Sequence, residues 1–131
     1  MHNAPESLLR QLYDGYRRGD LSSFPELVSP DCEWIFPGDA SILPWAGHYR
    51  GLEIFEFAKR IVGSIAYEHF DDHTYLPSGE SVTVILHERC RVLCTGNAFT
   101  NDIAAVATVR DGRLTRYVEY SDTAAMERAF R

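Results

Sequence analysis

The sequence predicts an α+β fold in which a cone-shaped, curved antiparallel sheet wraps around N-terminal helices, in the order α-α-β-α-β-β-β-β-α. Apolar residues recur at helical spacing in the first half of the chain, whereas after Gly63 they alternate with a period of two. The breaks between the later segments span only two or three residues, too few for the crossover that parallel strands need. A cone that stays open at one end forms a pocket for a small ligand.

The helices of the first half have recognisable ends. The first is predicted to start at Pro5, which suits a first helical turn, and to end at Gly19. A second, short helix is predicted after Ser23, which has capping-box spacing to Glu26. The third is predicted between Gly51 and Gly63. The apolar stripes of the first and third helices are Leu8, Leu9, Leu12, Tyr13 and Tyr16, and Leu52, Phe55, Ala58, Ile61 and Val62.

Strands are predicted where apolar residues alternate or form short runs. One strand covers residues 32–36 and precedes a loop rich in proline and glycine. The strands of the later meander cover 67–76, 81–93, 98–110 and 113–120. Asp122 can cap a last helix over 123–130.

Composition bounds the function. The 131 residues suit a single domain, 1–131. The net charge of −6 argues against a nucleic-acid partner, which needs a basic face. No apolar run approaches the ~20 residues of a membrane span, and no signal peptide is recognisable at the N-terminus. Cys32, Cys90 and Cys94 are odd in number and lack C-x-x-C spacing, so we expect a reducing, cytoplasmic location.

Three stretches carry a family resemblance: GDL…F..LVSPDCEWIFPG…PWAGHYRG, HERCRVLCTGNAF and VRDGRLTRYVEYSD. The chain resembles the nuclear-transport-factor-2-like superfamily, in its SnoaL-like branch, over nearly its whole length. That branch holds ketosteroid isomerases, polyketide cyclases and limonene epoxide hydrolase. The resemblance implies a cone-shaped protein that works without a cofactor and forms a homodimer through its sheet. Because one fold hosts many functions, it implies less about chemistry.

Ketosteroid isomerase uses a tyrosine on its first helix, an aspartate base on its first strand and a protonated aspartic acid on a later strand. The alignment places Leu12 at the tyrosine, Phe36 at the base, and Ala104 or Ala105 at the acid. All are apolar, although Tyr16, one helical turn after Leu12, can stand in for the tyrosine. Isomerisation by that mechanism is not expected.

Limonene epoxide hydrolase offers a closer local match. HERCRVL resembles its strand with an arginine and an aspartate two residues apart, and RYVEYSD resembles its final strand with a second carboxylate. By this alignment Arg89 is kept, Glu119 takes the place of the second carboxylate, and Arg91 replaces the first. Trp34 and Phe36 stand at the residues that position the water. The chain thus lacks part of that machinery.

Strand alternation yields the candidate site. It puts His87, Arg89 and Arg91 on one face of their strand, and Tyr117, Glu119 and Ser121 on one face of the last strand. If both faces point into the cone, Glu119 and Arg89 are the catalytic pair. The proposed substrate-binding residues around them are Tyr16, Trp34, Phe36, His48, His87, Arg91 and Tyr117.

Two alternatives stay open for these charges. Arg89 and Glu119 can form a structural ion pair, or the faces can be reversed, which would bury Cys90 and Val92 instead. His48, in AGHYRG, lies near the pocket mouth in the family and can transfer a proton, or it is a solvated loop histidine. A metal between His69 and His73 is rejected, because their backbones stand roughly 13 Å apart along a strand.

Three hypotheses on function follow. The first is a cofactor-free acid–base enzyme of isomerase, cyclase or hydrolase type acting on a hydrophobic small molecule. The second is a non-catalytic binder of such a molecule. The third is a protein-interaction module whose cone is filled by side chains, indicated by a cavity below ~100 Å³, where ligand sites usually have ~300–1,000 Å³.

Overall fold

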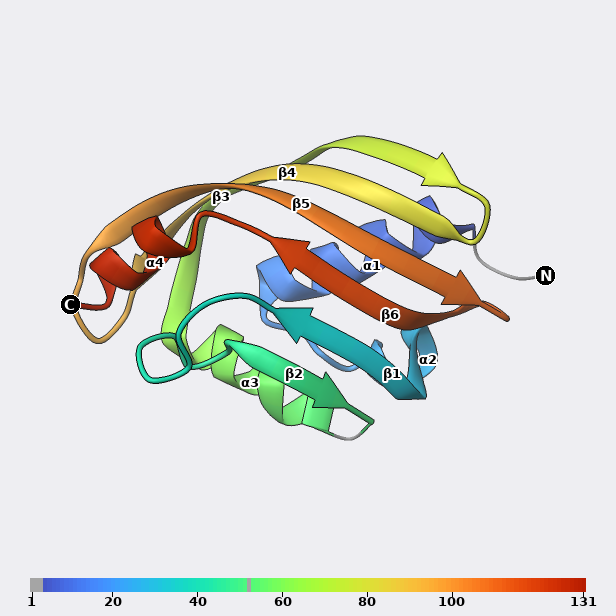
Figure 1. Ribbon diagram of the computed structural model, residues 1–131, viewed down its shortest axis with the longest axis horizontal. Helices are drawn as coiled ribbons and strands as arrows, with labels where there is room; N and C mark the ends of the chain where they lie inside the picture. The colour runs from blue at the N-terminus through green and yellow to red at the C-terminus, as the bar shows by residue number, and fades with distance from the viewer. Residues whose placement is uncertain (1–3, 52) are drawn as a thin grey trace.

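A computed structural model describes residues 4–51 and 53–131. Six strands form one curved sheet in the order β2-β1-β6-β5-β4-β3, which arches over α1 and α3 without closing into a barrel (Figure 1). This confirms the α+β class and the cone shape. In chain order the elements are α1 Pro5–Arg18, α2 Phe24–Leu27, β1 Val28–Phe36, β2 Gly47–Arg50, α3 Glu53–Ser64, β3 Ile65–Ser78, β4 Ser81–Val92, β5 Ala98–Arg110, β6 Arg113–Tyr120 and α4 Thr123–Ala129.

Helix α1 follows the predicted pattern. Pro5 occupies the first turn, and the acidic side chain of Glu6 lies at the positive end of the helix dipole. The helix ends at Gly19, whose φ of 67° lies in the left-handed region that glycine adopts without strain. The whole predicted stripe of α1 is buried against the sheet.

The meander is antiparallel, as predicted. Strand β3 pairs with β4, β4 with β5, and β5 with β6. The β5–β6 turn has Asp111 at φ 52° and Gly112 at φ 76°, the two positive values that a two-residue hairpin of type I′ needs. Asp122 caps α4, because its carboxylate accepts a hydrogen bond from the backbone N–H of Ala125.

Two features of the sheet were not predicted. Strand β1 pairs with β6 in parallel, which makes the sheet mixed. The pairing is possible because the many residues between the two strands supply the long crossover that parallel strands need. The loop after β1 contains the short strand β2, which pairs antiparallel with β1 from Glu33↔Arg50 to Phe36↔Gly47. The element order is therefore α-α-β-β-α-β-β-β-β-α.

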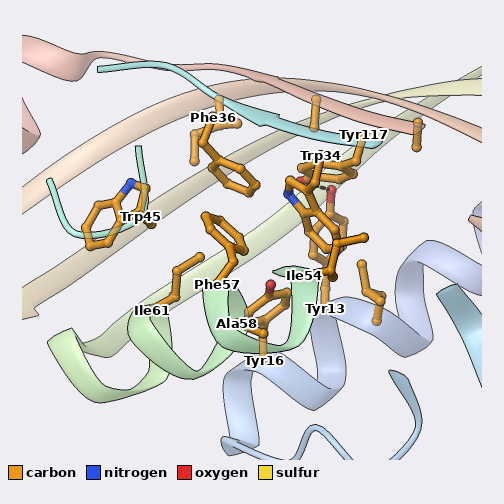
Figure 2. Packing of buried hydrophobic residues seen from close by; sticks show 14 of the residues in the cluster. Tyr13, Tyr16, Trp34, Phe36, Trp45, Ile54, Phe57, Ala58, Ile61 and Tyr117 are labelled. Carbon is orange, nitrogen blue, oxygen red and sulfur yellow. Dashed lines mark hydrogen bonds between the residues drawn. The ribbon is translucent and has the colours of Figure 1, made fainter. Parts of the chain in front are cut away.

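Aromatic rings fill the space between the sheet and the helices (Figure 2). The Trp34 ring lies 4.8 Å from that of Tyr117, and the Phe36 ring lies 4.2 Å from that of Phe57 on α3, centroid to centroid. Ala58 and Ile61 of the predicted α3 stripe are buried and Val62 is partly buried, whereas Leu52 and the side chain of Phe55 lie outside the described residues. The core thus lies on the concave face of the sheet.

Candidate functional site

A small cavity lies inside the cone, with a volume of about 40 Å³. It has room for about three water molecules, well below the ~300–1,000 Å³ of usual ligand sites. Its walls come from α1, α3, α4, the loop 37–46 and every strand of the sheet but β2. The lining residues are Tyr13, Tyr16, Trp34, Phe36, Trp45, Ile61, Ile65, Tyr67, Phe70, Leu86, Glu88, Ile103, Tyr117, Glu119 and Met126.

The face of β4 that points into the cone is the one opposite to that predicted. Its even-numbered residues from Val82 to Val92 are buried, and Leu86 and Glu88 line the cavity. His87, Arg89 and Arg91 therefore point outward, and their placement in the pocket was wrong. The physical reason is desolvation: turning this strand over would bury three basic side chains and expose a row that is apolar except for one glutamate.

The outward side chains of β4 have acidic partners on the convex face. Nε of Arg89 and Nε of Arg91 each lie 3.1 Å from a carboxylate oxygen of Glu68. Nδ1 of His87 lies 2.8 Å from Oδ1 of Asp102. The predicted Arg89–Glu119 pair does not form, because the sheet separates the two side chains.

His48 also lies away from the cavity. Its Nε2 lies 2.8 Å from a carboxylate oxygen of Glu33, which also pairs with Arg50 and Arg116. Strand β2 holds this histidine in register with Ile35 of β1, so the expectation of a histidine at the pocket mouth was wrong.

The remaining predicted site residues do line the cavity. Tyr16 comes from α1, Trp34 and Phe36 from β1, and Tyr117 and Glu119 from β6. Their roles in binding or catalysis stay predictions. The structure therefore brings together five of the predicted residues and separates them from the four basic ones.

Glu88 is a cavity residue that the sequence analysis missed. It is only 6% exposed. Burial raises its pKa from 4.5 to about 7, and the neighbouring polar groups of Cys90 and Asn101 oppose this shift. The signal was present in the alternation: a single glutamate interrupts the apolar row Leu86, Glu88, Cys90, Val92. The carboxylate that the alignment to epoxide hydrolase found missing at Arg91 has a counterpart in Glu88, three positions earlier on the opposite face of the strand.

Glu119 faces the same cavity from β6. Burial raises its pKa well above the usual value, the charge of Glu88 raises it further, and the Ser121 hydroxyl opposes the shift. We call Glu88 and Glu119 the carboxyl pair. None of the described lining residues is Arg, Lys or His.

Asn101 on β5 is a buried polar neighbour of Glu88. It lies directly opposite Glu88 in the β4–β5 ladder and is 2% exposed. Its Oδ1 accepts a hydrogen bond of 2.8 Å from the backbone N–H of Asp122. Because the carbonyl oxygen is held there, the amide nitrogen is the atom left to donate, and Nδ2 has no hydrogen-bond partner among the described residues.

Hydroxyl and indole groups complete the polar lining. The hydroxyls of Tyr13 and Tyr117 form a buried hydrogen bond of 2.8 Å. The hydroxyl of Tyr16 and Nε1 of Trp34 are buried without a partner among the described residues. Burial raises the pKa of Tyr16 and Tyr117 well above the usual range, so both stay protonated at neutral pH.

The arrangement can transfer protons. Two carboxyl groups with raised pKa values can take and give protons near neutrality, and unpaired donors can hold an oxygen of a bound molecule. Within the described part of the chain, no three His, Cys, Asp or Glu side chains gather as a metal-binding group. None of the described helices is both long and apolar enough to span a membrane.

Comparison with known proteins identifies the family. The sequence profile of the SnoaL-like domain matches residues 9–117. An uncharacterized protein of Mycobacterium tuberculosis is 28% identical over 131 residues, with 95% of each chain covered. An NTF2-like protein from Burkholderia xenovorans LB400 superimposes with a TM-score of 0.87 at 26% identity, covering 100% of this chain and 98% of that one. TerC, co-crystallised with polyporic acid, has a TM-score of 0.82 at 23% identity, with 98% of each chain covered. The chain belongs to the SnoaL-like domain family and has the NTF2-like fold.

Proposed function

We propose that this protein is a cofactor-free acid–base enzyme that acts on a small, largely hydrophobic molecule held between the carboxyl pair and the aromatic wall. The observation that carries the proposal is two carboxyl groups facing one cavity that has no basic residue among its described lining. Burying an ionisable group without a partner costs several kcal/mol, and an ion pair does not offset that cost here. Perturbed carboxyls in a cavity are typical of catalytic sites.

The two carboxyls suit different roles. Glu88, with a pKa of about 7, is a general base that is partly ionised at neutral pH. Glu119, whose pKa lies well above its ordinary value, is a proton donor. The Tyr16 hydroxyl and the Trp34 N–H can donate to a substrate oxygen that gains negative charge. Together they can remove a proton at one position of a substrate and return one at another.

Substrate entry requires wall side chains to move, because the cavity holds about 40 Å³. The Phe36 and Phe57 rings, 4.2 Å apart, meet between the sheet and α3. Phe36 lines the cavity, so a rotamer change of its ring would enlarge it. That TerC was co-crystallised with polyporic acid supports the admission of a small organic molecule by a protein of this fold.

A second candidate is a protein-interaction module whose cone is filled by its own side chains. The small cavity favours it, since its volume lies below the ~100 Å³ expected of such a module. The carboxyl pair disfavours it, because an interior that serves only as a core has no use for two acidic groups, of which Glu88 is 6% exposed. The homodimer expected from the family stays a prediction, which analytical ultracentrifugation tests.

Solvent-deuterium exchange tests the enzyme without knowledge of the product. The protein is incubated in D₂O with small cyclic ketones and enones, and deuterium at their acidic C–H positions is followed by NMR. We expect exchange with the wild type and loss of roughly 100-fold or more in rate with Glu88→Gln or Glu119→Gln. Glu68→Gln, on the convex face, is the matched control and should exchange like the wild type. Equal rates in all folded variants would refute the assignment.

A further inference from the structure

We infer that the cavity binds a small organic cation, such as a protonated primary amine, in preference to neutral or anionic molecules of the same size. The inference names the ligand class of the site proposed above and rests on its being a small-molecule site. It does not depend on catalysis. The observations behind it are the charge of the lining, its aromatic surface, an unpartnered hydroxyl and the cavity volume.

The lining is acidic and nothing in it is basic. Glu88 and Glu119 are the only acidic residues among the described residues that line the cavity. The arginines of β4 lie on the other side of the sheet, where Glu68 pairs with them. An anionic ligand would meet two carboxyls in a desolvated space, whereas an ammonium group would supply the cation that they lack.

Aromatic rings form much of the wall, which is the second requirement for an organic cation. Ring faces carry negative potential and attract an ammonium or alkylammonium group within about 6 Å. Trp34 is central among them: its ring lies 4.8 Å from Tyr117 and 6.5 Å from Tyr16, centroid to centroid. Figure 2 shows these rings gathered between the strands and the helices.

An unpartnered polar group provides an independent indication of a ligand. Tyr16 is 7% exposed, lines the cavity, and its hydroxyl has no hydrogen-bond partner among the described residues. A hydroxyl oxygen accepts hydrogen bonds, and an ammonium group has three N–H bonds to donate. One ammonium group can therefore serve the Tyr16 oxygen and the carboxyl pair together.

The cavity volume limits what enters. About 40 Å³, or about three waters, suits a head group of the size of methylammonium. The remainder of the ligand must occupy space that is opened when wall side chains change rotamer. A slim alkylamine is therefore a better probe than a bulky ring system.

Binding should depend on pH in a direction that the surroundings define. Glu88 faces Asn101 and Cys90, and Glu119 faces Ser121. From α1, β3 and β6 the ionisable groups nearby are the hydroxyls of Tyr13, Tyr16, Tyr67 and Tyr117, which stay neutral. A cation favours the ionised carboxyl, so binding releases a proton, and affinity rises up to about tenfold per pH unit until the carboxyl is ionised without ligand.

Matched probes test the inference on the full chain. Calorimetry with n-butylammonium, 1-butanol and butyrate compares a cation, a neutral molecule and an anion of similar size. We expect n-butylammonium to bind at least about tenfold more tightly than 1-butanol, and butyrate not to bind. Its affinity should rise between about pH 5.5 and pH 7, with proton release visible as a dependence on buffer ionisation enthalpy.

Substitutions of cavity residues test whether the preference for n-butylammonium arises in the cavity. Glu88→Gln and Glu119→Gln should each reduce the preference for n-butylammonium by about tenfold, and Tyr16→Phe by less, while Glu68→Gln should leave it unchanged. Circular dichroism verifies folding, and Tyr16→Phe keeps the test valid if a glutamine variant does not fold. Equal binding of all three probes, binding of none, or a preference untouched in the folded cavity variants would overturn the inference. A preference for the cation without deuterium exchange would refute only the proposed enzymatic activity. Deuterium exchange without that preference would refute only the proposed cation binding.

Discussion

The two faces of the sheet treat the same residue type in opposite ways. On the convex face, Glu68 pairs with two arginines, and Glu33 pairs with His48, Arg50 and Arg116. On the concave face, Glu88 and Glu119 have no cationic partner within the described lining. The pKa of Glu33 is lowered, chiefly by its hydrogen bond to Arg116, whereas burial raises the pKa of both concave glutamates.

This contrast shows where charge matters in the molecule. Exposed ion pairs contribute about 0–1 kcal/mol each, because water screens them and side-chain entropy opposes them. A desolvated carboxyl instead becomes proton-bearing near neutral pH, which makes it costly for stability and useful for chemistry or ligand binding.

The largest difference in stability loss is expected between substitutions at two adjacent residues of β4. Leu86→Ala removes a side chain that is 2% exposed and should cost about 2–5 kcal/mol in the free energy of unfolding. His87→Ala, one residue further and on the convex face, should cost less than about 1 kcal/mol. Urea denaturation followed by circular dichroism measures both. Similar losses for the two variants would contradict the assignment of the faces.

The pH dependence of stability should come from the concave face. Unfolded Glu88 ionises near pH 4.5, whereas folded Glu88 keeps its proton up to about pH 7. The folded state therefore binds more protons in this window, and its stability falls as pH rises, by about 3 kcal/mol. Glu88→Gln should remove this contribution to the slope and leave that of Glu119, whose pKa is also raised by burial, as denaturant midpoints measured across the window would show.

Glu68→Gln is the control for that slope. Because Glu68 lies on the convex face beside Arg89 and Arg91, its replacement should leave the loss of stability between about pH 4.5 and pH 7 in place. Parallel curves for the wild type and Glu88→Gln would show that Glu88 ionises normally and would remove it as a base.

Asn101→Ala should have an intermediate effect. It leaves the backbone N–H of Asp122 without its acceptor, which should cost about 1–3 kcal/mol. Asp102→Ala, on the neighbouring residue of β5, removes a side chain that is 87% exposed and should change stability by at most about 0.5 kcal/mol. Thermal unfolding compares the two, and equal shifts would mean that the Asn101 hydrogen bond contributes little.

The smallest effect is expected for Arg89→Ala. The pair with Glu68 is exposed, so its removal should cost less than about 1 kcal/mol, and less still at high salt. Deuterium exchange and amine binding should both be unchanged, because Arg89 lies outside the cavity. A loss of either function would mean that Arg89 contributes to the cavity and would contradict its outward orientation.

Much of the fold could be predicted from local patterns. The stripe of α1, the stop at Gly19, the hairpin at Asp111 and Gly112, and the cap at Asp122 all follow from nearby residues. Strand β2 was missed, because a four-residue strand beginning with glycine has too little alternation to stand out from its loop. The parallel pairing of β1 with β6 joins segments about 80 residues apart, which no local pattern reports.

The candidate site was half predicted. Tyr117 and Glu119 line the cavity as expected, because the opposite orientation would have buried Arg116. On β4 the alternation fits either face, and the prediction placed Arg89 inward although the opposite face, which contains Glu88, is the more apolar one. The burial preference of that row would have identified Glu88.

The sequence by itself determined the helices, the meander strands and which residues share a face, because periods of 3.6 and 2 are local properties of the chain. Only the tertiary structure decided which face is enclosed and which charges meet. Those outcomes depend on the side of the sheet against which α1 and α3 pack, and on the pairing of strands far apart in the chain. For that reason Glu119 lies in one cavity with Glu88, and not with Arg89.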